Sequence, residues 1–165
     1  MQRSAWWGNC QSIMTNLIPT DRSIPFQMRG SFHAFEMLMQ RALRDRDLQL
    51  SHFYVLRVLW EENGIPQKRV AQQTFTTEST AAQVLAAMER LGLVERHYDP
   101  ADKRRRIVHL TAKANDMREG VVTLVRSMYE RVTAGLDQGT IDNFLAINAR
   151  LRKNLDAEYE RRFDS

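Results

Sequence analysis

The chain has 165 residues, with 24 lysines and arginines against 20 aspartates and glutamates, 43% hydrophobic residues and one cysteine. These values are typical of one globular domain and exclude disordered, collagen-like and disulfide-scaffold proteins. No stretch approaches the roughly 18 uninterrupted apolar residues of a membrane-spanning helix, and polar residues break any signal-peptide core before Pro19. We therefore expect a cytoplasmic protein with no membrane partner.

An arm and a first helix open the chain. Residues 1–30 contain prolines and a glycine without a sustained hydrophobic period, which predicts an arm that depends on contacts elsewhere for its order. From Ser31, apolar residues recur at helical spacing up to Leu43. The charged run 44–47 is expected to end this first helix.

Three shorter helices follow, each marked by its boundary residues. Ser51 stands where an N-cap is expected for a second helix that stops at Gly64. Pro66 suits the first turn of a third helix. Thr76 or Thr77 can cap a fourth helix, which ends before a glycine.

The hydrophobic period then changes to that of strands. Residues 93–98 and 107–110 are β-compatible runs, and residues 99–102 between them have the chemistry of a turn. This pattern predicts a two-stranded hairpin. Its tip carries four consecutive cations at positions 103–106, a possible electrostatic footprint for nucleic acid.

Two long helices close the chain. Thr111 caps a fifth helix, and a sixth follows Gly135 and Gly139. Their apolar stripes exceed what a compact three-helix core can cover, so we predict a homodimer in which residues 31–50 and 112–163 form the dimerisation helices. Asn148 lies in the stripe of the sixth helix, where it either sets the helix register or faces water at the edge.

The order of elements predicts a mainly α fold, a winged helix-turn-helix (α-α-α-α-β-β-α-α) whose DNA-binding region spans residues 51–111. The outer face of the fourth helix has short side chains that are uncharged except at its C-terminal end, as close approach to a major groove requires. Gln83 can bond adenine in bidentate fashion, and Thr80 can touch a thymine methyl. The alternative is an ordinary amphipathic helix with a polar surface.

Several short motifs stand out in this region: Ser79-Thr80, the helix end and strand MERLGLVER at 88–96, Asp102-Lys103-Arg104 in the hairpin, and VHLT at 108–111. Together they resemble the motifs of the MarR (multiple-antibiotic-resistance regulator) family. The resemblance extends over about residues 30–162. Three positions depart from the common pattern: Gln83 replaces an arginine of many members, Met88 a leucine and Ala114 a glycine.

The resemblance implies how the chain would bind a pseudo-palindromic double-stranded DNA operator. The hairpin of residues 93–110 would be the wing of this fold. Asp102 would orient Arg104 at the tip of the wing, and Arg104 would enter the minor groove. The neighbouring cations would face phosphates, although solvation explains each of them singly. The residues expected to contact DNA are Thr77, Ser79, Thr80, Gln83, Arg90, Asp102, Lys103, Arg104, Arg105 and Arg106.

The resemblance also implies a repressor that a small aromatic acid or phenol releases from DNA. Such an effector would lie between the dimerisation helices and the winged region, with His33 or His52 receiving its carboxylate and with Phe53 and Trp60 beside its ring. Plain core packing is the alternative for each apolar member. The expected ligand-binding residues are His33, Met37, Gln40, His52, Phe53, Leu56 and Trp60.

Other classes of function have little support in the sequence. It lacks a glycine-rich phosphate loop and a paired nucleophile and base, so we expect neither an enzyme nor a cofactor. His33 and Glu36, one helical turn apart, keep a metal-binding helical protein as an alternative, although no metal site is assigned. A redox-responsive repressor using Cys10 is the other alternative.

Overall fold

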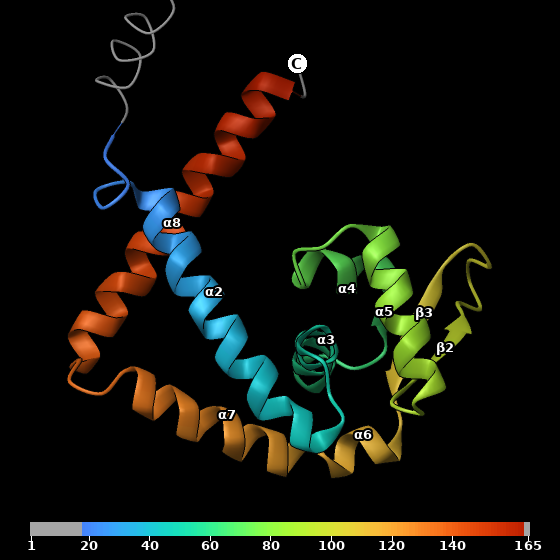
Figure 1. The fold of residues 1–165 in the computed structure, drawn as a ribbon. Coiled ribbons are helices and arrows are strands. Elements are labelled where there is room, and N and C mark those ends of the chain that lie inside the picture. The colour runs from blue at the N-terminus through green and yellow to red at the C-terminus, as the bar shows by residue number, and fades with distance from the viewer. Residues whose placement is uncertain (1–17, 164–165) are drawn as a thin grey trace, which may run out of the picture. The chain divides into compact units, whose positions relative to one another are not determined.

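A computed structural model describes residues 18–163 of the chain (Figure 1). It is mainly helical and contains a three-stranded antiparallel sheet, which confirms the predicted fold class. The elements in chain order are α2 (Ile24–Leu43), the 3-10 helix η1 (Arg44–Arg46), α3 (Leu50–Glu61), β1 (Ile65–Pro66), α4 (Gln67–Gln73), α5 (Glu78–Arg90), β2 (Val94–Tyr98), β3 (Arg106–Leu110), α6 (Ala112–Asp116), α7 (Arg118–Val132) and α8 (Gln138–Phe163).

The chain divides into two compact units after Val121. The first unit has a hydrophobic core built from α2 to α6 and the start of α7, and its most deeply buried large side chains are Met39, Leu43, Leu56, Leu59, Val70, Leu85, Met88, Val94, Val108 and Val121. The second unit holds the rest of α7 and all of α8, and no residue of α8 is buried. Among the described residues, no helix is both long enough and apolar enough to cross a bilayer.

The first helix begins earlier than the sequence predicts. α2 starts at Ile24, so the last seven residues of the expected arm are helical and the boundary at residue 30 is wrong. Pro25 lies in the first turn, where a missing N–H costs no intrahelical hydrogen bond. Gly30 lies inside the helix, where its cost is only about 1 kcal/mol relative to alanine.

The second helix has a different cap from the one expected. Gln49, not Ser51, is the N-cap of α3. Gln49 and His52 form a capping box, in which the Gln49 side chain accepts from the backbone of His52 and the Gln49 N–H donates to His52 Nδ1 at 3.3 Å. A reciprocal pair satisfies two otherwise unpaired N–H groups and outweighs a single serine cap.

The sheet contains a strand that the sequence did not reveal. β1 is only two residues long and pairs with β3, Ile65 opposite Val108 and Pro66 opposite Ile107, so the strand order is β1-β3-β2. Pro66 is also the N-cap of α4 rather than a residue of its first turn. The hairpin of β2 and β3 is confirmed, with Arg96 opposite Val108.

The fifth helix is interrupted, contrary to the single long helix predicted. Thr111 caps α6 as expected, its Oγ1 accepting from the Ala114 N–H at 3.3 Å. α6 ends at Asp116 with Met117 as its C-cap, and α7 begins at Arg118. The break is one residue long, and such a short interruption leaves the apolar period of the flanking turns readable as one helix.

Candidate nucleic-acid interface

Helix α5, the predicted recognition helix that would enter a major groove, has a well-defined start. Thr77 is its N-cap, and Thr77 Oγ1 accepts from the Thr80 N–H at 3.1 Å. The two threonine hydroxyls lie 2.9 Å apart. This pair leaves the Thr80 hydroxyl engaged within the helix, so the methyl group is the part of Thr80 best suited to contact a base.

α5 presents one buried face and one exposed face. Ala81, Leu85 and Met88 are buried. The predicted contact residues Ser79 and Gln83 are exposed on the helix, as are Thr77, Thr80 and Arg90. Within the described part of the chain, the Gln83 amide has no hydrogen-bond partner, so both its donor and its acceptor are available.

The helix ends in a left-handed glycine. Gly92 has φ +66°, and its N–H donates to the Glu89 carbonyl at 3.0 Å. The Leu93 N–H then donates to the Met88 carbonyl at 2.9 Å. These bonds turn the chain directly from the recognition helix into strand β2.

Two aspartates hold the turn of the wing. Asp99 Oδ1 accepts from the Ala101 N–H at 2.9 Å, and Asp102 Oδ1 accepts from the Arg104 N–H at 3.0 Å. Asp102 therefore orients the backbone of Arg104, and the guanidinium of Arg104 projects from a turn that is already closed. The resemblance implied that Asp102 orients Arg104, and the structure adds that the carboxylate binds the backbone N–H of Arg104.

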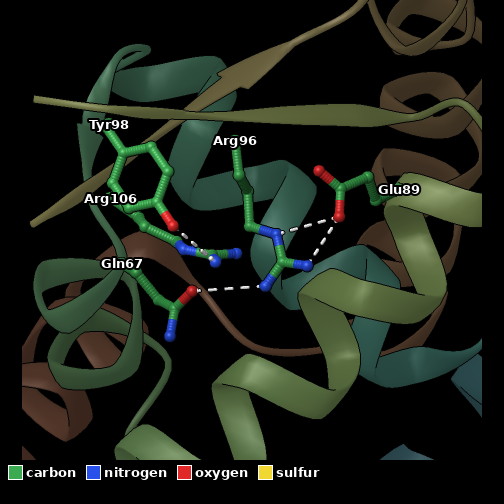
Figure 2. Close-up of polar contacts among 5 residues, drawn as sticks. All are labelled: Gln67, Glu89, Arg96, Tyr98 and Arg106. Carbon is green, nitrogen blue, oxygen red and sulfur yellow. Dashed lines mark hydrogen bonds and ion pairs between the residues drawn. The ribbon is translucent and has the colours of Figure 1, made fainter.

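The four cations of the wing differ in their partners. Lys103 and Arg104 are exposed and have no ion-pair partner among residues 18–163. Arg105 Nη1 lies 3.9 Å from Asp99 Oδ2. Arg106 donates to the Tyr98 hydroxyl at 3.3 Å, and its guanidinium lies 5.2 Å from the centre of that ring (Figure 2).

Arg96 on β2 joins three elements, and sequence reasoning missed it. Its guanidinium donates to Glu89 Oε2 on α5 at 2.6 and 3.1 Å and to Gln67 Oε1 at the start of α4 at 3.5 Å (Figure 2). The Arg96 side chain is only 11% exposed. Hydrogen bonding from Arg96 holds the pKa of the Glu89 carboxyl below its ordinary value. Both residues stand in the MERLGLVER motif, which was the available signal.

A cleft lies between the wing, the start of α4 and the start of α5. Its volume is about 640 Å³. We call it the basic cleft, because four of its lining side chains are cationic and one is acidic. The lining residues are Pro66, Gln67, Lys68, Glu78, Arg104, Arg105 and Arg106.

The expected effector residues differ in exposure, and Gln40 and Trp60 are half-buried. His33 and Met37 are exposed on α2. His52, Phe53 and Leu56 on α3 are buried in the core of the first unit. Burial lowers the pKa of the His52 imidazole.

Three of the expected effector residues already have polar partners. Gln40 Oε1 accepts from the Leu50 N–H at 3.1 Å, and Trp60 Nε1 donates to the Ala114 carbonyl at 3.2 Å. His52 Nδ1 accepts within the capping box, which leaves its Nε2 for another partner. These hydrogen bonds therefore stabilise the fold of the protein without an effector.

A buried hydroxyl beside this group was not predicted. The Tyr54 hydroxyl is inaccessible to solvent and has no hydrogen-bond partner among the described residues. Burial raises its pKa, and the negative charge of Glu36 raises it further. No sequence signal marks it, because the requirement for a partner arises only from packing.

The described residues offer no support for the metal alternative. Among them, no three histidine, cysteine, aspartate or glutamate side chains come together as ligands for one ion. Cys10, on which the redox alternative depends, lies outside the described residues.

Comparison with known proteins places these features in context. A sequence model of the MarR family matches residues 46–105, from η1 to the wing. The transcriptional regulator HosA of Escherichia coli O111:H- is 32% identical over 131 residues, an alignment that covers 79% of this chain and 93% of HosA.

Solved structures share the fold. The Staphylococcus aureus MepR–DNA complex superposes with a TM-score of 0.74 at 19% identity, covering 81% of this chain and 98% of that one. The PcaV regulator of Streptomyces coelicolor, solved in complex with its natural ligand, superposes with a TM-score of 0.73 at 20% identity, covering 83% of this chain and 96% of that one.

Proposed function

The chain belongs to the MarR family of transcriptional regulators, and from this premise we propose that it is a homodimeric repressor released from its DNA operator by a small aromatic acid or phenol. As a member of this family it regulates transcription and is not an enzyme. The observation that carries the DNA-binding site is the exposed face of α5 beside a cation-rich wing. The complex of MepR with DNA supports this use of the fold.

Within this site, α5 reads bases and the wing contributes phosphate contacts. Gln83 has a free amide on a helix of short side chains, a combination that suits bidentate bonding to adenine. Arg104 projects from the closed turn toward a minor groove. Lys103, Arg105 and Arg106 contact phosphates, which position the protein without reading the sequence.

Two variants separate these roles. Gln83→Ala is expected to lose about 1–3 kcal/mol of operator binding and to relax the preference at one base pair. Arg105→Ala is expected to weaken all duplexes alike, because a phosphate contact carries no sequence information. Binding to a library of operator variants measures both profiles. An unchanged base preference in Gln83→Ala would refute the proposed orientation of α5.

Exposed apolar side chains support the dimer in both units. In the second unit, α8 exposes Phe144, Leu145, Ile147, Leu155, Tyr159 and Phe163. In the first unit, α2 exposes Ile24, Phe26, Met28, Phe32, Met37 and Leu38. Surfaces of this kind on two helices are typical of an interface between protein chains.

An effector acts by favouring one dimer geometry over another. Both recognition helices reach successive major grooves only at one spacing, and a ligand bound near α2 and α3 can stabilise a different spacing. His33 or His52 receives the carboxylate, and Phe53 and Trp60 lie beside the ring. Since burial keeps His52 neutral, it would donate a hydrogen bond rather than supply a charge. The natural ligand of PcaV supports a ligand site in this fold.

Reciprocal coupling tests the effector. The ligand is expected to weaken operator binding by roughly 5- to 150-fold, and operator DNA must weaken ligand binding by the same factor. Titration of aromatic acids by tryptophan fluorescence, with and without operator, measures this, and Trp60→Phe identifies the signal of Trp60 against Trp6 and Trp7. If no aromatic acid binds, or DNA leaves its affinity unchanged, a ligand-independent or Cys10-dependent repressor replaces this mechanism.

A further inference from the structure

The basic cleft brings together residues from three elements. Lys68 comes from α4, Glu78 from the first turn of α5, and three consecutive arginines from the wing. Among the lining residues the positive side chains outnumber the single carboxylate four to one. Such an excess of positive charge in a concave surface favours an anionic ligand.

The geometry of DNA identifies the anion. Adjoining major and minor grooves are separated by one sugar-phosphate strand. If α5 enters a major groove and the wing tip enters the neighbouring minor groove, that strand must cross between them. The basic cleft lies between the start of α5 and the wing, so it faces this strand.

Resting on the proposed function, we infer that the basic cleft binds this DNA strand, that Lys68 contacts one of its phosphates, and that Glu78 holds Lys68 in the free protein. Lys68 Nζ lies 3.8 Å from Glu78 Oε1. Neither the wing motif nor the outer face of α5 includes Lys68, which enters the site only because Pro66 pairs with Ile107 and brings the start of α4 beside β3.

The ion pair of Lys68 and Glu78 is easily exchanged. The two side chains are 69% and 64% exposed, so water and salt screen their attraction. A phosphate offers Lys68 a second anionic partner without the cost of breaking a buried pair. DNA binding therefore replaces the contact of Lys68 with Glu78 by a contact with a phosphate. Because the Glu78 carboxylate repels the negatively charged strand, it lowers the affinity for DNA.

Salt dependence of binding tests this assignment in the full chain. Lys68→Gln is expected to make the log–log slope of affinity against salt shallower by about 2 in a dimer, since each phosphate contact contributes roughly 0.9. Glu78→Gln is expected to bind the operator more tightly at low salt. Arg57 and Glu61 provide a matched control, because this pair on α3 is also 3.8 Å apart with side chains 64% and 73% exposed, outside the cleft. Arg57→Gln and Glu61→Gln should leave slope and affinity unchanged.

A neutral phosphate analogue localises the contact. Single methylphosphonates are placed at successive positions between the two groove contacts of the operator. At one position the substitution is expected to weaken binding of wild-type protein. Lys68→Gln is expected to bind the operator substituted at that position as well as the unsubstituted operator. The inference is overturned if the salt slope of Lys68→Gln equals that of Arg57→Gln. It is also overturned if the methylphosphonate lowers the operator affinity of wild type and Lys68→Gln by the same factor. If wild-type protein binds no duplex, the proposed function fails together with it.

Discussion

At the scale of residues, His52 couples folding to pH. Its side chain is 3% exposed, and burial lowers its pKa below the ordinary value near 6.5. The unfolded chain therefore takes up a proton at a pH where the folded chain does not. The stabilising contribution is complete above about pH 6.5 and is lost as the pH falls through the lower folded-state pKa.

The variant His52→Gln is expected to lose this pH dependence. Glutamine at the third helical position preserves the capping box with Gln49, so the start of α3 should remain intact. Urea unfolding between about pH 8 and pH 5 measures the slope of stability against pH. His33→Gln, at an exposed position, is the control and should keep the wild-type slope. Equal slopes in wild type and His52→Gln would show that another group is responsible.

At the scale of elements, the ion pair of Arg96 and Glu89 ties the wing to the recognition helix. Two hydrogen bonds of 2.6 and 3.1 Å join β2 to α5, and Gln67 adds α4 to the same guanidinium (Figure 2). In the proposed complex α5 and the wing enter neighbouring grooves together, so their relative position would determine whether both can bind. We therefore regard Arg96 as a positioning residue for DNA binding.

Arg96→Gln is expected to lower the free energy of unfolding by about 1 kcal/mol, since the pair is charged and only partly exposed. Hydroxyl-radical footprinting on the operator should show the protection by the wing weakened while protection by α5 remains. The reversed pair, Glu89→Arg with Arg96→Glu, should restore part of the footprint. A wild-type footprint from Arg96→Gln would reduce the pair to a purely structural contact.

At the scale of the whole molecule, the proposed dimer would determine which DNA is bound. Two recognition helices that enter successive major grooves on one side of the duplex require half-sites about 10 bp apart. α8 carries exposed apolar residues in the second unit, among them Leu155 at 67% exposure. We expect these residues to lie in the interface between the two copies.

Leu155→Glu is expected to give a monomer that loses binding to a two-half-site operator, because a charge in an apolar interface is costly. Sedimentation measures the oligomeric state, and changing the half-site spacing by about 5 bp should abolish wild-type binding by rotating one site to the opposite side of the duplex. Circular dichroism verifies that the helices remain folded. A wild-type monomer at micromolar concentration would contradict the dimer.

The sequence by itself determined the winged region, because its signals are local. A threonine cap, a closing glycine and a change of hydrophobic period each act within a few residues, and they marked α5 between Thr76 or Thr77 and Gly92 and the hairpin after it. The cations of the wing were equally readable, since four stand consecutively. Family membership followed from the same short motifs.

Only the tertiary structure decided which distant residues meet. The two-residue strand β1 has no period of its own and exists because β3 provides hydrogen-bond partners. Arg96 and Gln67 are 29 positions apart, and Lys68 lines one cleft with the wing arginines, 36 to 38 positions away, next to the point where β1 pairs with β3. Local propensity cannot encode such contacts, because they join elements that are far apart in the sequence and close in space. Their free energy arises from the packing of these elements against one another.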